Sequence, residues 1–195
     1  MIAHAVYLIR HGETEDNAAA RLTGQRDSPL TSRGVLQATT DGRLLAELID
    51  ASACDFVASP LGRACRTMEL VREAMGCAPT NYRTDARLME FDLGDWHGHP
   101  YEGERAFRKQ HEALHGADAW HKPWPNGESR AQFFSRVKDF LKTIDRDTVI
   151  VSHGGTVRMM RAALLNLNVG DMFAFTAPNA GLIEISRGRE RMHGQ

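Results

Sequence analysis

The chain has 195 residues, of which 42% are hydrophobic and 25% are charged, as is typical of one soluble globular domain with a substantial core. Its formal net charge of −1 argues against a general nucleic-acid binder or a membrane-surface binder, since the sequence has neither a basic excess nor a basic block. Any anion site must therefore be local and built from a few placed cations. We expect residues 1–195 to form a single domain.

The cysteines and the first residues indicate the cellular compartment in which the protein is expected. Cys54, Cys65 and Cys77 are odd in number and form no C-x-x-C pair, so we expect small core residues in a reducing cytoplasm rather than disulfides or a zinc knuckle. The opening MIAHAVYLI is too short for a signal peptide, and no run approaches the roughly 20 apolar residues that span a bilayer. The sequence predicts a cytoplasmic protein without a membrane partner.

The chain begins with a predicted strand and a predicted helix. Residues 5–9, AVYLI, form an apolar run that predicts a buried strand. A helix is expected to begin after Thr31, whose hydroxyl can cap it, and to end near Asp50. Gly42 weakens this helix. Its apolar stripe is predicted to consist of Val35, Leu36, Leu44, Leu45, Leu48 and Ile49.

A second strand and helix follow directly. Residues 55–58, DFVA, predict a short buried strand. Ser59 and Pro60 suit the N-cap and the first position of a helix. Gly76 is expected to end that helix. Its apolar residues at helical spacing are Leu61, Ala64, Cys65, Met68, Val71 and Met75.

Residues 91–127 have a different character. They contain five glycines, three prolines, five histidines and three tryptophans. This composition predicts a loop-rich excursion with one helix near Gly103 to Leu114. Trp120 and Trp124 either line a substrate pocket or pack the excursion onto the domain.

Regular structure resumes after the excursion. Helices are predicted at residues 131–144 and 156–165, a buried strand at 148–151, and a strand at 182–185 that closes the sheet. The polar tail is expected to fray. Strands that alternate with helices imply a layered α/β fold with a largely parallel sheet, in which ligands lie beyond the carboxyl ends of strands.

Two predicted strands end in the same way. Leu8 to Gly12 reads LIRHG, and Ile150 to Gly154 reads IVSHG. A glycine after each histidine lets the backbone turn sharply and lets a ligand approach closely. A third strand end opens the helix that carries Arg63 and Arg66. These three strand ends therefore offer two histidines and up to three arginines to one edge of the sheet.

This residue set suits phosphate chemistry. Arginines beside a helix N-terminus supply planar donors and free backbone N–H groups for a phosphate. A neutral imidazole can attack phosphorus, and a neighbouring cation such as Arg10 favours the neutral form of His11. The leaving oxygen needs a proton, and Glu90 stands in a short apolar setting where burial or a bound phosphate would favour a protonated carboxyl. A lone histidine at a strand end is more often an ordinary hydrogen-bonded loop residue, so the argument depends on the whole set.

The ordered motifs of the chain resemble those of the histidine phosphatase superfamily, which has the phosphoglycerate-mutase-like fold. The segments that carry the resemblance are LIRHGET (Leu8 to Thr14), Asn17, RLTGQRDSPLTSRG (Arg21 to Gly34), SPLGRACRT (Ser59 to Thr67), MEFDLGDWHG (Met89 to Gly98), PNGES (Pro125 to Ser129) and SHGG (Ser152 to Gly155). The resemblance covers most of the chain and implies a three-layer α/β/α domain with a mostly parallel sheet. It also implies that the excursion at about 91–127 covers the active site.

The resemblance implies a role for individual residues. His11 would be the nucleophile that becomes a phosphohistidine, and Glu90 the general acid and then the base for water. His153 would complete the catalytic set and, with Arg10 and Arg63, clamp the phosphate. Further phosphate-binding positions are Asn17, Gly24, Gln25 and Gly154. No metal or organic cofactor is implied.

Some of these residues have plainer interpretations. Asn17 is alternatively a helix cap, and Arg66 is better explained by a salt bridge than by substrate contact. The spacing of His97 with His99, and of His111 with His115, invites a zinc site, but no cysteine or carboxylate completes a ligand set. A solvated helix face is the better interpretation of these histidines.

Within the superfamily, the sequence favours the phosphatase branch, which includes α-ribazole phosphatase and broad-specificity phosphatases. The mutases carry an E-R-[HY]-Y-G block and an Arg-Arg pair, whereas this chain has Glu90-Phe91-Asp92-Leu93-Gly94 and no adjacent arginines. His97 and Thr23 also depart from common residues of the phosphatases. We therefore predict a phosphomonoesterase for a small phosphate ester, acting as a monomer or homodimer. The alternatives are a phosphoglycerate mutase and an inactive homologue that binds a phosphorylated ligand.

Overall fold

A computed structural model describes residues 3–194 and shows one six-stranded sheet in the order β3-β2-β4-β1-β5-β6. Pairing is parallel between β2 and β3, β2 and β4, and β1 and β4, whereas β5 and β6 are antiparallel additions beside β1. The largely parallel sheet predicted from the sequence is confirmed. The strands are β1 (Val6–Arg10), β2 (Asp55–Ala58), β3 (Arg83–Thr84), β4 (Thr148–Ser152), β5 (Leu182–Ser186) and β6 (Arg189–His193).

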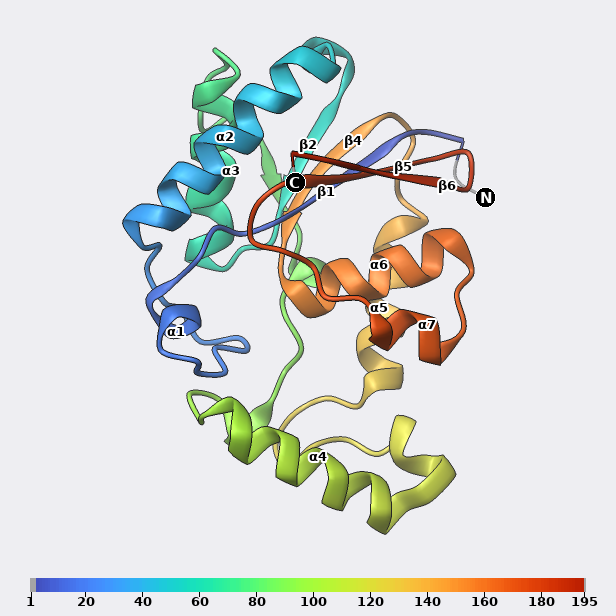
Figure 1. Ribbon diagram of the computed structural model, residues 1–195. Helices are drawn as coiled ribbons and strands as arrows, with labels where there is room; N and C mark the ends of the chain where they lie inside the picture. The colour runs from blue at the N-terminus through green and yellow to red at the C-terminus, as the bar shows by residue number, and fades with distance from the viewer. Residues whose placement is uncertain (1–2, 195) are drawn as a thin grey trace.

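Helices cover both faces of the sheet, which gives the predicted three layers (Figure 1). The α-helices are α1 (Glu15–Ala18), α2 (Ser32–Leu48), α3 (Gly62–Ala74), α4 (Tyr101–His115), α5 (Arg130–Leu141), α6 (Gly154–Leu165) and α7 (Val169–Ala174). Among the residues described, no helix is long and apolar enough to cross a membrane.

The strands divide their side chains between two cores because successive residues of a strand point to opposite faces. On β1, Val6 and Leu8 belong to the core shared with α5 and α6, whereas Tyr7 and Ile9 belong to the core under α2 and α3. All four positions are buried. A strand buried on both faces explains why the sequence there is a continuous apolar run rather than an alternating one.

The apolar stripe predicted for α2 is partly wrong. Thr31 caps the helix by accepting a hydrogen bond from the Gly34 N–H, as predicted. However, Val35 and Leu36 are exposed, as is Leu48. The face that α2 buries is made largely of small residues, because α2 and α3 approach so closely that a Cβ on Gly42 would collide with the Val71 carbonyl oxygen. The buried residues of α2 are Gly34, Ala38, Asp41, Gly42 and Leu45.

Other predicted boundaries also differ. The helix α3 begins at Gly62 after an N-cap at Leu61, so the prediction that Ser59 and Pro60 begin the helix is wrong. The polar tail forms β6 along β5, so β5 does not close the sheet. The three cysteines are partly exposed rather than core residues.

The excursion carries α4 close to the predicted position and holds its own aromatic cluster. Trp124 is buried and makes edge-to-face contacts with Phe91 and Phe107, and Trp96 packs on the other side of the Phe107 ring. Trp120 packs against aromatic rings of α5 and α7. Trp120 therefore attaches the excursion to the domain, whereas Trp124 packs within the excursion's own cluster. In Figure 1 α4 lies below the main domain, at the end where α1 is found.

Asp41 is a buried carboxyl with an unusual proton affinity. It lies on α2 with 2% of its surface exposed, and its Oδ1 accepts a hydrogen bond of 2.7 Å from the Gly181 N–H. Its Oδ2 is buried and has no hydrogen-bond partner within residues 3–194. Burial raises the pKa of Asp41 from 3.8 to about 6, and the Gly181 N–H only partly opposes this effect.

Replacing Asp41 with asparagine should therefore change how stability depends on pH. The folded state binds this proton more tightly than the unfolded chain, so the contribution of Asp41 is fully present below about pH 3.8 and is lost as the pH rises through about 6. We expect the free energy of unfolding of the wild type, minus that of Asp41→Asn, to fall by about 2 kcal/mol between pH 4 and pH 7. Urea denaturation at both pH values measures it, and a difference independent of pH would contradict it.

Candidate active site

Three strand ends meet at one edge of the sheet because their registers are matched. In the parallel pairing, Arg10 lies opposite Ser152, and Ala58 lies opposite Val151. The hydrogen bonds continue one residue further, from the His11 N–H to the Ser152 carbonyl at 2.8 Å and from the Ser59 N–H to the Val151 carbonyl at 3.0 Å. The residues that follow the three strands are thereby held side by side, as the sequence predicted.

His11 is buried with a defined tautomer. Its Nδ1 lies 2.8 Å from the Gly12 carbonyl oxygen, which accepts, so Nδ1 carries the proton. Its Nε2 accepts a hydrogen bond of 3.1 Å from Nε of Arg63. Burial, and then the charges of Arg63 and Arg10, hold the pKa of His11 well below 6.5. The imidazole is neutral near pH 7, with its Nε2 lone pair directed at the arginine.

The turn after His11 depends on Gly12. A Cβ at this position would collide with the carbonyl oxygen of Gly34. The turn is held by the Thr67 hydroxyl, which accepts from the Gly12 N–H at 3.1 Å, and by the Asn179 amide, which donates to the His11 carbonyl at 2.9 Å. Contacts from distant segments thus hold the backbone on both sides of the His11–Gly12 peptide bond.

Arg63 is held by two backbone carbonyls and by an acidic cap. Its Nη1 donates to the Arg26 carbonyl at 2.6 Å and its Nη2 to the Gly24 carbonyl at 2.7 Å. Asp27 accepts from the Gly62 and Arg63 N–H groups and so caps α3 from a different segment. Burial lowers the pKa of Arg63. The guanidinium is therefore fixed in position beside His11.

His153 faces His11 across the site. Their rings lie edge to face with centroids 5.2 Å apart. The Ser59 hydroxyl accepts weakly from the Leu61 N–H at 3.4 Å and lies 2.7 Å from Nε2 of His153, so its own proton is free to go to that nitrogen. With the Ser59 hydroxyl donating to Nε2, the proton of His153 is on Nδ1. Burial, and then nearby positive charge, hold the pKa of His153 well below 6.5.

Two buried donors at the site have no hydrogen-bond partner among the described residues. One is Nδ1 of His153, and the other is Nε of Arg10, whose Nη1 donates to the Ala177 carbonyl at 2.8 Å. Burial lowers the pKa of Arg10. Leaving a buried donor unpaired costs about 1–3 kcal/mol, and a bound anion would remove that cost for both. A Cβ on Gly154, at the start of α6, would lie 3.3 Å from Nε of Arg10, so the glycine leaves room there.

Glu90 completes the arrangement at the N-terminus of α6. Its Oε2 accepts from the Gly155 N–H at 2.9 Å and its Oε1 from the Phe91 N–H at 2.8 Å. A Cβ on Gly155 would collide with the carboxylate. The carboxylate is close enough to Arg10 and Arg63 to raise the pKa of both, against the larger effect of burial. The structure therefore gathers His11, Glu90, Arg10, Arg63 and His153 in one place.

Sequence reasoning missed the residues that hold Glu90. The 87–90 segment has few backbone partners of its own, and Arg136 on α5 donates to the carbonyls of Arg87, Met89 and Glu90 at 2.7–2.9 Å. Glu128 forms a bidentate pair with Arg136 at 2.6 and 3.0 Å and also accepts from the Asp92 N–H. Glu128 belongs to the PNGES segment, so the sequence motif marked this residue as one of interest. The motif did not indicate that Glu128 holds Arg136 and the Asp92 N–H.

Of the remaining predicted phosphate-binding residues, Asn17 lies in α1, and Gly24 and Gln25 lie in the loop that follows it. Asn17 forms a capping box with Thr14, which is the plainer of its two interpretations. Gly24 has φ +55° and presents its carbonyl to Arg63. Gln25 donates its amide to the Glu90 carbonyl at 3.0 Å. These contacts are made without a ligand, and the predicted role of the three in binding phosphate remains a prediction.

Residues outside the site also have clear partners. Arg66 pairs with Glu69 in solvent at 3.0 Å, as its plainer interpretation predicted. Nε2 of His97 accepts from the backbone N–H groups of Gln25 and Leu93 at 3.3 and 3.1 Å, and burial lowers its pKa. His97 thus connects the excursion to the loop beside Arg63.

Comparison with known proteins gives consistent results. The model of the Histidine phosphatase superfamily (branch 1) matches residues 6–194. A Serratia proteamaculans protein named "Probable phosphoglycerate mutase GpmB" is 36% identical over 173 residues, which cover 83% of this chain and 75% of that protein. The alpha-ribazole phosphatase of Shigella flexneri superposes with a TM-score of 0.77 and 26% identity, covering 97% of this chain and 94% of that one.

A second solved structure, the mycobacterial glucosyl-3-phosphoglycerate phosphatase in complex with VO3, has a TM-score of 0.74 and 30% identity, covering 97% of both chains. The chain is thus similar in structure to proteins named as phosphatases and in sequence to one named as a mutase. Similar proteins are therefore named for both the predicted phosphatase function and its first alternative, the phosphoglycerate mutase.

Proposed function

This chain belongs to the histidine phosphatase superfamily, and from that premise we propose that it is a phosphomonoesterase that hydrolyses a small phosphate ester through a phosphohistidine on His11, without a metal. The observation that carries the proposal is the pair of unpartnered buried donors, Nε of Arg10 and Nδ1 of His153, beside a neutral imidazole. The similar phosphatases support the reaction class.

In the proposed reaction, the ester phosphate lies between Arg10, Arg63 and His153. The Nε–H of Arg63 then donates its hydrogen bond to a phosphate oxygen instead of to Nε2 of His11. The lone pair of Nε2 is thereby free to react. Nε2 attacks phosphorus, the bond to the ester oxygen breaks, and Glu90 gives that oxygen a proton. The arginines and the N-terminus of α6 stabilise the charge of the transferring group.

The second step returns His11 to its starting form. Glu90, now a carboxylate, accepts a proton from a water molecule that attacks the phosphohistidine. The nitrogen–phosphorus bond breaks, and phosphate leaves. The hydrogen bond from Nδ1 of His11 to the Gly12 carbonyl keeps Nε2 available throughout.

A phosphoglycerate mutase is the second candidate, because the GpmB protein is 36% identical to this chain. Both reactions share the first step, and they differ in whether the phosphoenzyme gives its phosphoryl group to water or to a hydroxyl of a phosphoglycerate. The adjacent arginine pair of the mutases is missing from this sequence. This difference favours hydrolysis.

Product partition decides between the candidates. The protein is incubated with 3-phosphoglycerate and with a panel of phosphate monoesters, with and without EDTA, and phosphate release and phosphoglycerate isomerisation are both measured. We expect phosphate release to exceed isomerisation, with specificity constants unchanged by EDTA. Faster isomerisation would establish the mutase. No turnover on any ester, together with measurable vanadate binding, would establish an inactive binding homologue.

A further inference from the structure

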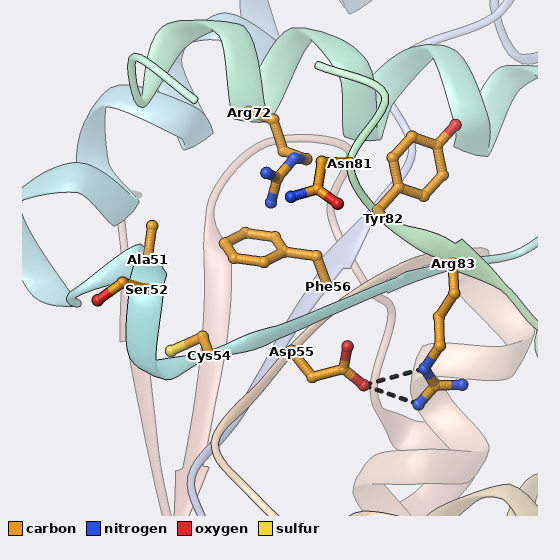
Figure 2. A pocket seen from close by; sticks show the side chains of 9 residues that line it. All are labelled: Ala51, Ser52, Cys54, Asp55, Phe56, Arg72, Asn81, Tyr82 and Arg83. Atoms are coloured by element: carbon orange, nitrogen blue, oxygen red, sulfur yellow. Dashed lines mark hydrogen bonds and ion pairs between the residues drawn. The ribbon is translucent and has the colours of Figure 1, made fainter. Parts of the chain in front are cut away.

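A cavity lies away from the candidate active site. It has a volume of about 450 Å³, within the range of small-molecule sites, and Figure 2 shows the residues around it. It is lined by the start of β2, the end of α3 and residues 81–83. The opposite ends of β2 and α3 lead to Ser59 and carry Arg63. The cavity and the candidate active site are therefore at opposite ends of the same strand and helix.

Arg72 is the unusual residue of this cavity. The residue is 95% buried, and its guanidinium carbon lies 4.3 Å from the centroid of the Phe56 ring. Its Nε donates to the Ala78 carbonyl at 2.9 Å, which fixes the plane of the guanidinium. Figure 2 shows its terminal nitrogens over the Phe56 ring, on the side where Asn81 lies. The two terminal nitrogens of Arg72 have no acceptor within residues 3–194, so they are available to a ligand that enters the cavity.

The other charges of the lining do not neutralise Arg72. Arg83 is paired with Asp55 by two hydrogen bonds of 2.8 and 3.0 Å. Asp50, which lies outside the lining, accepts from the N–H and the hydroxyl of Ser52. No aspartate or glutamate oxygen in the described part of the chain forms an ion pair with Arg72. The lining therefore retains one uncompensated positive charge.

We propose that this cavity binds a small monocarboxylate, whose two oxygens accept from the terminal nitrogens of Arg72 and whose body lies against Asn81 and Tyr82. The planar guanidinium fork matches a carboxylate in geometry, and one free positive charge matches a single negative charge. A phosphate dianion would need more cations than the lining supplies. The site is separate from the proposed phosphatase reaction and does not depend on it.

Benzoate and its neutral analogue benzamide test the proposal. In an NMR titration of the full chain, benzoate should give saturable shifts at the amides of residues 51–56 and 81–83, with a Kd on the order of 1 mM, and benzamide should not. Arg63→Met, at the candidate active site, should leave this Kd unchanged. Shifts confined to the surroundings of His11, equal binding of benzamide, or no saturation with benzoate would each overturn the proposal.

Variants of the cavity complete the test. Arg72→Met should raise the Kd for benzoate at least about tenfold, since the charged fork is removed. Because this variant also loses the bond to the Ala78 carbonyl, the exposed residue Asn81 provides a second variant, and Asn81→Leu should raise the Kd about threefold without unfolding the chain. A Kd unchanged in a folded Asn81→Leu and in a folded Arg72→Met would place benzoate elsewhere and contradict the assignment.

Discussion

The His11→Ala variant is expected to lose at least about ten-thousand-fold in kcat, because the proposed nucleophile has no substitute at the site. His153 cannot take its place, since its Nε2 is occupied by the Ser59 hydroxyl and its Nδ1 carries the proton. Quenching the reaction of the wild type with a ³²P-labelled ester in alkaline detergent should trap an acid-labile, base-stable phosphohistidine. The variant should trap none.

A matched histidine controls this experiment. His121 is exposed and lies outside the site, so His121→Ala should keep both turnover and the trapped label. A thermal melt should show that His11→Ala is folded. Label that persists in His11→Ala, or label found on another side chain of the wild type, would disprove the assignment of His11.

Replacing Arg63 with methionine should have the next largest effect. The guanidinium contributes the donor nearest His11, and removing one such donor typically costs about 10²–10³-fold in kcat. Arg63→Lys should recover only a small part of the loss, because one ammonium nitrogen cannot occupy the three positions from which Nε, Nη1 and Nη2 of Arg63 donate. Steady-state kinetics on the best ester of the panel measures both variants.

Arg66 is the matched control, because it lies on the same helix and pairs with Glu69 in solvent. Arg66→Met should keep the wild-type kcat and KM within about twofold, as exposed ion pairs contribute little. Equal losses in the two methionine variants would show that the effect comes from α3 as a whole. Arg63→Met with wild-type kcat would remove Arg63 from the mechanism.

The sequence predicted which residues share one edge of the sheet better than it predicted the helices around them. The two His-Gly strand ends were readable because a buried parallel strand is a continuous apolar run and the polar residue that follows it must lie at the sheet edge. The family resemblance and the three layers are confirmed. The buried face of α2 was not readable, because two closely packed helices use glycine and alanine where a hydrophobicity pattern expects leucine.

Long-range contacts account for the other misses. Arg136 reaches carbonyls 46 to 49 residues earlier in the chain, and no local pattern connects the two segments. Asp27 caps α3 from 35 residues away, so the local candidate Ser59 was chosen for a role it does not have. The strand β6 was missed because polar side chains on an edge strand look like a frayed tail. Each miss concerns a partner that only the folded chain brings near.

The bond between Arg63 and Nε2 of His11 has a consequence for the resting protein. A neutral imidazole with an open lone pair is a nucleophile toward any electrophile that reaches it, and not only toward a phosphate. Here the lone pair is occupied by an N–H group from a side chain that is 1% exposed. An uncharged electrophile brings no anionic acceptor for that N–H, whereas a phosphate brings oxygen atoms that can accept its hydrogen bond. The proposed nucleophile is therefore protected until an anion replaces the imidazole as the acceptor of that N–H, and selection among ligands would begin before any bond to phosphorus forms.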